Sequence, residues 1–160
     1  MLEKKIINIA VHGVGTIGKR HLMAMSENQN VNLSGIIDIS DEAKQFCDNK
    51  NIPIYENLID LRKKSEIDGV IISTPTIFHY ENTLAALELG LDVLIEKPIS
   101  ADVLEARTIA KVAEENNCKV LVGHQRRFYP LVRKAKEIVK NGEIGKIIGC
   151  LLYTSDAADE

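Results

Sequence analysis

The sequence predicts an α/β fold in which helices cover both faces of a doubly wound parallel sheet. Short β-branched apolar runs alternate with longer stretches of helical periodicity, as in parallel strands joined by crossover helices. The first run is apolar almost throughout, which is typical of a strand buried on both faces. A glycine-rich turn then joins that run to the first helical stretch. Six such strands fit the spatial order 3-2-1-4-5-6.

Turn and cap residues set the limits of the elements. Ser40 and Ser100 are candidate helix N-caps, Gly90 is a candidate residue just past a helix end, and Pro130 and Gly142 bracket the last helix. The expected strands are residues 6–11, 33–38, 53–55, 70–73, 93–95 and 119–122. The expected helices are 16–28, one after Ser40, 58–63, one ending at Gly90, 101–116 and 130–141, the last with Leu131, Ala135, Ile138 and Val139 on one face.

Length and composition describe an ordinary globular chain. Its 160 residues are 45% hydrophobic and 27% charged, with a formal net charge of −3, which argues against disorder. Basic residues are scattered among acidic ones and Trp is absent, so neither a basic surface nor a stacking platform for bases is expected. We therefore expect no nucleic-acid partner.

Apolar runs and cysteines indicate a cytoplasmic protein. The run over residues 6–11 is too short for the core of a signal peptide, and no stretch could cross a bilayer. Cys47, Cys118 and Cys150 have neither disulfide nor metal-ligand spacing. We expect a reducing compartment, no membrane partner and no bound metal.

Gly13, Gly15 and Gly18, with Thr16 and Ile17 between them, form the pattern G-x-G-x-x-G. In dinucleotide-binding loops the first glycine allows a tight turn, the second the approach of a pyrophosphate, and the third close helix–strand packing. The N–H groups and dipole at the helix start would then hold the phosphates. A glycine-rich turn without a ligand is the alternative, which the placement between strand and helix disfavours.

Asp38 ends the second expected strand, 20 residues after Gly18. A carboxylate at this place in dinucleotide-binding folds accepts hydrogen bonds from the adenosine ribose hydroxyls. It would repel a 2′-phosphate, and the next residues, Ile39 and Ser40, offer no arginine to compensate. NAD is therefore favoured over NADP as the cofactor. An ordinary polar strand end is the alternative interpretation.

Glu96-Lys97-Pro98 directly follows the fifth expected strand. Ligands of open α/β sheets lie beyond the carboxyl ends of the strands, so Lys97 is expected to point toward the cofactor crevice. A lysine there could hydrogen-bond a substrate hydroxyl and stabilise the alkoxide as hydride leaves its carbon. For the tripeptide alone, a solvated lysine in a proline turn is the stronger interpretation.

Together these motifs resemble the N-terminal Rossmann domain of the glucose-fructose oxidoreductase, inositol dehydrogenase and MocA (Gfo/Idh/MocA) family. The resemblance covers residues 6–149, and its most specific part is Glu-Lys-Pro combined with the early glycine loop. The matching pieces, in the family's order, are Gly13 to Gly18 with Lys19-Arg20-His21, Asp38, Ser73-Thr74-Pro75 with His79, Glu96-Lys97-Pro98, and Gly123-His124 with Arg126-Arg127-Phe128.

The resemblance implies an NAD(P)-dependent, homo-oligomeric oxidoreductase that acts on a CH–OH or carbonyl carbon of a sugar, cyclitol or polyol. The lysine matching Lys97 lies beside nicotinamide and substrate in relatives, and works with a histidine of a second domain. Two alternatives stay open: His79 could be a half-buried histidine bound to backbone groups, and Arg126 could simply be solvated. By the same resemblance, Thr74, Pro75, His79 and Glu96 lie along the cofactor, and Arg126 lies on the substrate side.

The expected organisation is a nucleotide-binding domain over residues 1–128, a connecting helix and the start of a second domain over 129–149, and a foreign tail over 150–160. The tail resembles an in-frame translation of a DNA-library adapter, and a natural acidic C-terminus is the alternative. A chain of this kind would bind NAD weakly without turnover. A non-catalytic redox-sensing module is the competing hypothesis, and Lys97 argues against it because a sensor has no use for a substrate-directed lysine.

Overall fold

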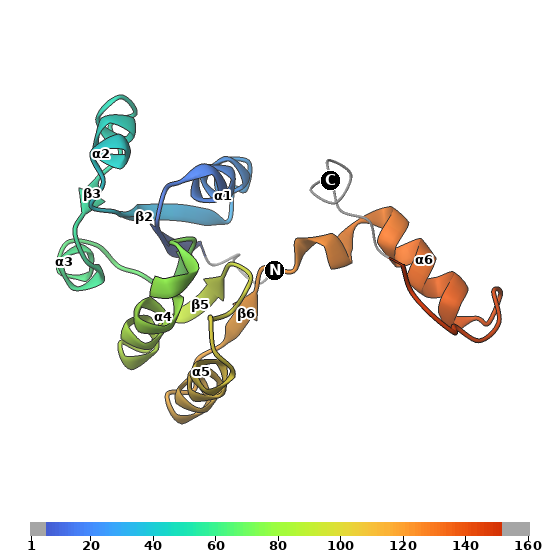
Figure 1. Cartoon of the computed structure of the whole chain (residues 1–160). Coiled ribbons are helices and arrows are strands. Elements are labelled where there is room, and N and C mark those ends of the chain that lie inside the picture. Colours follow the sequence, from blue (N-terminus) through green and yellow to red (C-terminus); the bar gives the residue numbers. More distant parts are fainter. Residues whose placement is uncertain (1–5, 152–160) are drawn as a thin grey trace, which may run out of the picture. The chain divides into compact units, whose positions relative to one another are not determined.

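The computed structural model describes residues 6–151. This part of the chain forms two units, whose boundary in the sequence lies between Gly123 and His124. A six-stranded sheet forms the centre of the first unit. All its strand pairs are parallel, and their order is β3-β2-β1-β4-β5-β6 (Figure 1). The predicted fold class and strand order are therefore confirmed. The strands are β1 (Ile7–His12), β2 (Val31–Ile37), β3 (Ile54–Tyr55), β4 (Gly69–Ile72), β5 (Asp92–Ile95) and β6 (Val120–Val122).

Helices cover both faces of this sheet. Neighbouring strand residues point to opposite faces, so Ala10 and Val11 of β1 belong to two different hydrophobic clusters. The cluster around Ala10 includes residues of α3, α4 and α5, and the cluster around Val11 includes residues of α1 and α2, as the two sides of the sheet in Figure 1 show. The helices are α1 (Thr16–Ser26), α2 (Asp41–Asp48), α3 (Leu58–Arg62), the 3-10 turn η1 (Thr76–Phe78), α4 (His79–Glu88) and α5 (Val103–Glu115).

Most predicted helix ends are confirmed, and one is wrong. The Ser40 side chain accepts a hydrogen bond from the first turn of α2, and Gly90 follows α4 with a φ of +73°. At α5, however, Asp102 is the N-cap in place of Ser100, because its carboxylate accepts from the backbone N–H groups of Leu104 and Glu105. The buried Ser100 hydroxyl instead donates to the Asp102 carbonyl oxygen.

The second unit contains the 3-10 turn η2 (Gln125–Phe128) and helix α6 (Pro130–Lys140). Helix α6 begins at Pro130 and is followed by Gly142 with a φ of +74°, as predicted. None of its residues is buried, and Leu131 of the predicted apolar face is 84% exposed. Most of the predicted foreign tail, residues 152–160, lies outside the described residues, and the domain limits at 128 and 149 stay predictions.

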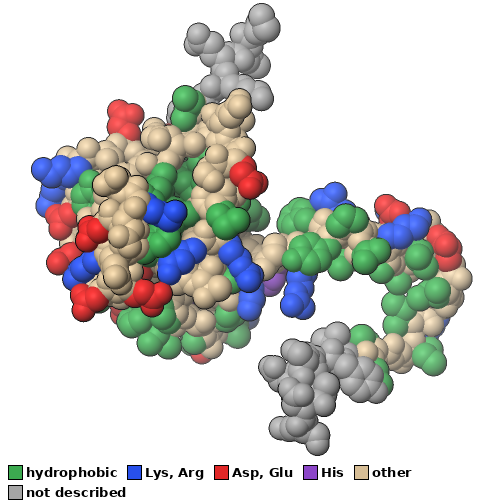
Figure 2. All heavy atoms as spheres, turned by 90° about the horizontal axis from the view of Figure 1, so that it is seen from above, with side chains coloured by type: hydrophobic (Ala, Val, Ile, Leu, Met, Phe, Trp, Pro, Cys, Tyr) green, Lys and Arg blue, Asp and Glu red, His purple; other side chains and the backbone are tan. Residues whose placement is uncertain are grey.

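Charges of both signs are interspersed on the face of the first unit that Figure 2 presents. No helix in the described part of the chain is long and apolar enough to cross a membrane. Within residues 6–151, no group of three or more His, Cys, Asp or Glu side chains is placed to hold a metal ion.

Replacing Asp102 with Ala tests the corrected cap. We expect Asp102→Ala to lower the free energy of unfolding by about 0.5–2 kcal/mol, because two N–H groups of α5 lose their acceptor. Asp102→Asn keeps an acceptor oxygen and is the matched control. Urea denaturation of the three proteins measures the difference, and equal midpoints for all three would contradict the assignment.

Candidate functional site

A pocket of about 670 Å³ lies at the carboxyl ends of β1, β2 and β4. It brings together seven of the predicted cofactor-binding residues, from the glycine loop, the end of β2 and the turn after β4. Five other predicted site residues, Gly18, His79, Glu96, Lys97 and Arg126, are not part of its lining. The lining consists of His12, Gly13, Gly15, Thr16, Ile17, Ile37, Asp38, Ile39, Ser40, Glu56, Ser73, Thr74, Pro75, Phe78 and Asn82.

The three loop glycines meet different steric demands. Gly13 has a φ of +89°, and a Cβ atom on it would lie 2.8 Å from the backbone nitrogen of Thr74. A Cβ atom on Gly18 would lie 2.0 Å from the carbonyl oxygen of Gly13, so only glycine lets α1 pack this closely on the loop. At Gly15 a Cβ atom would meet nothing within 4 Å. The fold therefore requires glycine at 13 and 18, whereas the space in front of Gly15 is open to a ligand.

Helix α1 begins at the pocket without a side-chain cap. Its N-cap residue is Gly15, and its first turn contains no acidic residue. By contrast, α2 and α5 are capped by Ser40 and Asp102. The first N–H groups of a helix have no acceptor within the helix and carry the positive end of its dipole. The start of α1 therefore suits an anionic group such as a phosphate.

Asp38 is fixed beside this helix start by three hydrogen bonds. One carboxylate oxygen accepts from the Val14 N–H at 2.9 Å, and the other accepts from the N–H (2.9 Å) and hydroxyl (2.8 Å) of Ser40. Burial opposes ionisation, but these bonds outweigh it and hold the pKa of Asp38 below its ordinary value. The pocket therefore presents a charged carboxylate in a fixed orientation.

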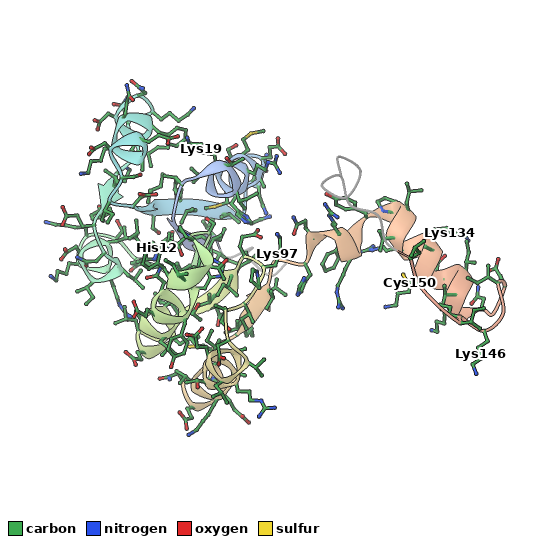
Figure 3. All side chains as sticks on the ribbon, viewed as in Figure 1. His12, Lys19, Lys97, Lys134, Lys146 and Cys150 are labelled. Atoms are coloured by element: carbon green, nitrogen blue, oxygen red, sulfur yellow. The ribbon has the colours of Figure 1, made fainter. Side chains whose placement is uncertain are left out.

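His12 is a pocket residue that the sequence analysis missed. It ends β1, next to Gly13 (Figure 3). Burial lowers the pKa of His12 to about 4, and the nearby Asp38 carboxylate only partly opposes this. The imidazole is therefore neutral at neutral pH. Its place at the carboxyl end of β1, directly before the glycine loop, was the available signal.

The turn after β4 and helix α4 each supply a pocket residue that the sequence analysis did not assign to the site. The Ser73 hydroxyl donates to the Gly13 carbonyl oxygen at 2.8 Å and so ties the glycine loop to β4. The Asn82 side-chain amide donates to the Thr74 hydroxyl at 3.2 Å. Asn82 lies three residues after His79 on α4, so helical spacing from that histidine would have pointed to it.

His79 is buried, at 2% exposure, and is bound to backbone groups. Its Nδ1 lies 2.8 Å from the carbonyl oxygen of Pro98, and its Nε2 lies 2.9 Å from that of Thr74. His79 thereby connects the turn after β4 to the turn after β5, and its contact with a cofactor stays a prediction.

Glu96 and Lys97 follow β5 as predicted, with opposite environments. The buried Glu96 carboxylate lies 2.9 Å from Nε2 of His21 on α1. Lys97 is exposed, and its amine has no hydrogen bond or ion pair with any described residue (Figure 3). Because β5 neighbours β4 in the sheet, Lys97 lies on the same carboxyl edge as the pocket.

Arg126, predicted on the substrate side, belongs to the second unit. It lies in η2 and is exposed. Its proposed contact with substrate stays a prediction.

Comparison with known proteins identifies the family. The family model described as an oxidoreductase family with an NAD-binding Rossmann fold, GFO_IDH_MocA, matches residues 7–124. The chain therefore belongs to the Gfo/Idh/MocA family, and the matched region is its NAD-binding Rossmann domain. The predicted resemblance is confirmed.

Individual relatives agree with this assignment. The rhizopine catabolism protein MocA of Rhizobium meliloti is 30% identical over 84% of this chain and 43% of its own length. The structure of myo-inositol 2-dehydrogenase from Lactobacillus plantarum has 34% identity and a TM-score of 0.82, over 90% of this chain and 44% of that one. A scyllo-inositol dehydrogenase from Lactobacillus casei with bound NAD(H) and scyllo-inositol has 30% identity and a TM-score of 0.80, over 89% of this chain and 43% of that one. This chain thus spans less than half the length of these relatives.

Alanine substitutions at Gly13 and Gly15 test whether the fold requires glycine at each position. We expect Gly13→Ala to lower the free energy of unfolding by about 1–3 kcal/mol, because its φ and its contact with the turn after β4 disfavour a Cβ atom. Gly15→Ala is expected to change it by no more than about 0.5 kcal/mol, because the added methyl group meets open space. Urea unfolding measures both, and equal losses would contradict the different roles.

The depressed pKa of His12 predicts a loss of stability in acid. Between pH 6.5 and about 4 the unfolded chain binds a proton at this residue that the folded chain does not. Stability is therefore fully present above about pH 6.5 and falls toward pH 4, by on the order of 3 kcal/mol. Urea unfolding across this window should show a steeper loss for the wild type than for His12→Gln. Parallel curves would contradict the burial argument.

Proposed function

We propose that this chain is the nucleotide-binding part of a longer oxidoreductase, which transfers hydride between NAD and a hydroxyl or carbonyl carbon of a sugar, cyclitol or polyol. The observation that carries the proposal is the pocket itself, where the uncapped start of α1 and the fixed carboxylate of Asp38 share one cavity. The relatives' own descriptions suggest the substrate class. They include inositol 2-dehydrogenase of Rhizobium meliloti and glucose-6-phosphate 3-dehydrogenase of Bacillus subtilis.

The pocket residues suit the parts of a dinucleotide. N–H groups of the first turn of α1 would bind the pyrophosphate, with Gly15 leaving room for its approach. Asp38 would accept hydrogen bonds from the adenosine ribose, and Thr74 and Pro75 would line the path from the glycine loop toward β5. When bound, NAD supplies the nicotinamide carbon that takes up or gives back hydride.

Lys97 acts on the substrate oxygen in this proposal. Its ammonium group would donate a hydrogen bond to the hydroxyl and stabilise the negative charge that develops on the oxygen as hydride leaves the adjacent carbon. The proton of the hydroxyl would pass to a histidine of the second domain that the family resemblance implies. We accordingly propose that the 160-residue chain alone does not turn over, and that the longer protein is a cytoplasmic homo-oligomer in which Arg126 contacts substrate.

The pocket favours NAD over NADP. The hydrogen bonds that depress the pKa of Asp38 keep its carboxylate charged at neutral pH, and a charged carboxylate repels a 2′-phosphate. His12, a pocket residue that interacts electrostatically with Asp38, is neutral there and supplies no compensating charge. A redox-sensing module without catalysis remains the second candidate. The exposed Lys97, whose amine has no partner among residues 6–151, favours the enzyme.

Cofactor titration tests the binding half of the proposal. The fluorescence of NADH should change on binding to the wild-type chain, which should bind NADH more tightly than NADPH. Gly15→Ala, which we expect to fold normally, should weaken binding of both, because its methyl group obstructs the phosphates. Asp38→Asn should lower the ratio of the NADPH to the NADH dissociation constant by tenfold or more. Asp48→Asn, which removes an exposed charge from α2, should leave this ratio unchanged. Tighter binding of NADPH by the wild type would refute the specificity argument.

Substitution of Lys97 tests the catalytic half in the longer protein. We expect Lys97→Met to lower turnover of a cyclitol or sugar substrate by about 10²–10⁴-fold, the usual effect of losing an acid–base group, while NADH binding stays within a few-fold of wild type. Absorbance of the NADH formed is the readout. A wild-type protein that binds NADH but oxidises no polyol would favour the sensor instead.

A further inference from the structure

The turn that carries Lys97 leaves the sheet immediately after β5. The Glu96 N–H donates to the Ile72 carbonyl oxygen at 2.9 Å, which is the last bond that ties this segment to β4. Two backbone groups farther along the turn bind side chains. The Lys97 N–H donates to the Glu96 carboxylate at 3.2 Å, and the Pro98 carbonyl oxygen accepts from His79.

The Glu96 carboxylate is held from three directions. One oxygen pairs with His21 of α1 at 2.9 Å, and the other accepts the Lys97 N–H. Gly123 closes the third side, because a Cβ atom on it would lie 3.1–3.2 Å from the carboxylate atoms. A buried carboxylate needs such partners, since burial of an unpaired charge is costly. The carboxylate therefore fixes the turn to α1 and packs against Gly123, the residue after β6.

His79 holds the other side of the same turn. It contacts the Pro98 carbonyl oxygen and also the carbonyl oxygen of Thr74, a pocket residue. Helix α4, which begins at His79, also supplies the pocket residue Asn82. Helices α1 and α4 thus both supply pocket residues, and both bind the turn at Glu96, Lys97 and Pro98, the lysine turn.

We propose that His21 and His79 are positioning residues for Lys97: through the Glu96 carboxylate and the Pro98 carbonyl, they fasten the lysine turn to the helices that form the nucleotide pocket. The backbone of Lys97 is fixed while its amine, unpaired among the described residues, is left for a ligand. A group held to a rigid base loses less freedom in the reacting complex, and misplacement by about 1 Å can cost 10²-fold in rate. The inference rests on the proposed role of Lys97.

Order in the lysine turn gives a test that does not need turnover. In ¹⁵N relaxation of the full 160-residue chain, the Lys97 amide should be rigid, with an order parameter near 0.85, and His21→Phe should lower it to below about 0.6. His21→Gln keeps a donor and should restore part of the order. Met25→Ala, on the same helix and packed against the core, is the control for general destabilisation and should leave the Lys97 amide rigid.

A second variant reaches the same carboxylate without touching the histidine. Gly123→Ala places a methyl group against Glu96 and should mobilise the Lys97 amide as His21→Phe does. His79→Phe should mobilise the turn from the Pro98 side. A Lys97 amide that stays rigid in all three variants, or that loosens equally in Met25→Ala, would overturn the proposal.

Kinetics of the longer protein separate this inference from the proposed function. His21→Phe should lower kcat by up to about 10²-fold while the KM for NAD changes little, because the phosphate-binding turn of α1 is intact. If Lys97→Met abolishes turnover but His21→Phe leaves kcat unchanged, Lys97 is catalytic and the positioning role is wrong. If Lys97→Met itself retains full turnover, the proposed function fails, whatever the relaxation data show.

Discussion

The close approach of α1 to the carbonyl group of Gly13 is the contact on which the site depends. Only a missing Cβ atom at Gly18 permits it, and the hydroxyl of Ser73, the residue after β4, donates to the same carbonyl oxygen. This contact sets the direction in which α1 leaves the loop, so that its first turn faces the pocket. One helical turn beyond Gly18, the same direction brings His21 to the carboxylate of Glu96. The absence of a Cβ atom at Gly18 therefore orients both the first turn of α1 toward the pocket and His21 toward Glu96.

Local signals were sufficient to predict the sheet and much of the pocket. Apolar runs define the strands, and the positions of Gly13, Gly15 and Asp38 relative to those runs identify a nucleotide loop, because each depends on residues close in sequence. The structure adds the reason for each glycine, and shows that Asp38 is held by Val14 and Ser40.

Pairings between distant segments could not be predicted in this way. Glu96 and His21 are 75 residues apart, and no periodicity connects them. The prediction of Glu96 as a cofactor contact did not anticipate that the fold would bury its carboxylate against α1. The predicted N-cap of α5 was wrong for a different reason. Ser100 and Asp102 are both residue types that cap helices well, and only the backbone conformation at the start of the helix determines which of them does so. The altered proton affinity of His12 likewise depends on burial, which a sequence does not display.

The three hydrogen bonds on Asp38 have a consequence for how a nucleotide arrives. A carboxylate held by three hydrogen bonds from its own loop and helix keeps accepting capacity, and it need not rotate or recruit a side chain when a ribose approaches. Recognition at this end of the pocket is then a docking of rigid surfaces, with little ordering entropy left to lose. The adenosine half of the ligand would then bind first. Conformational changes on binding would be confined to the nicotinamide half and the residues around it.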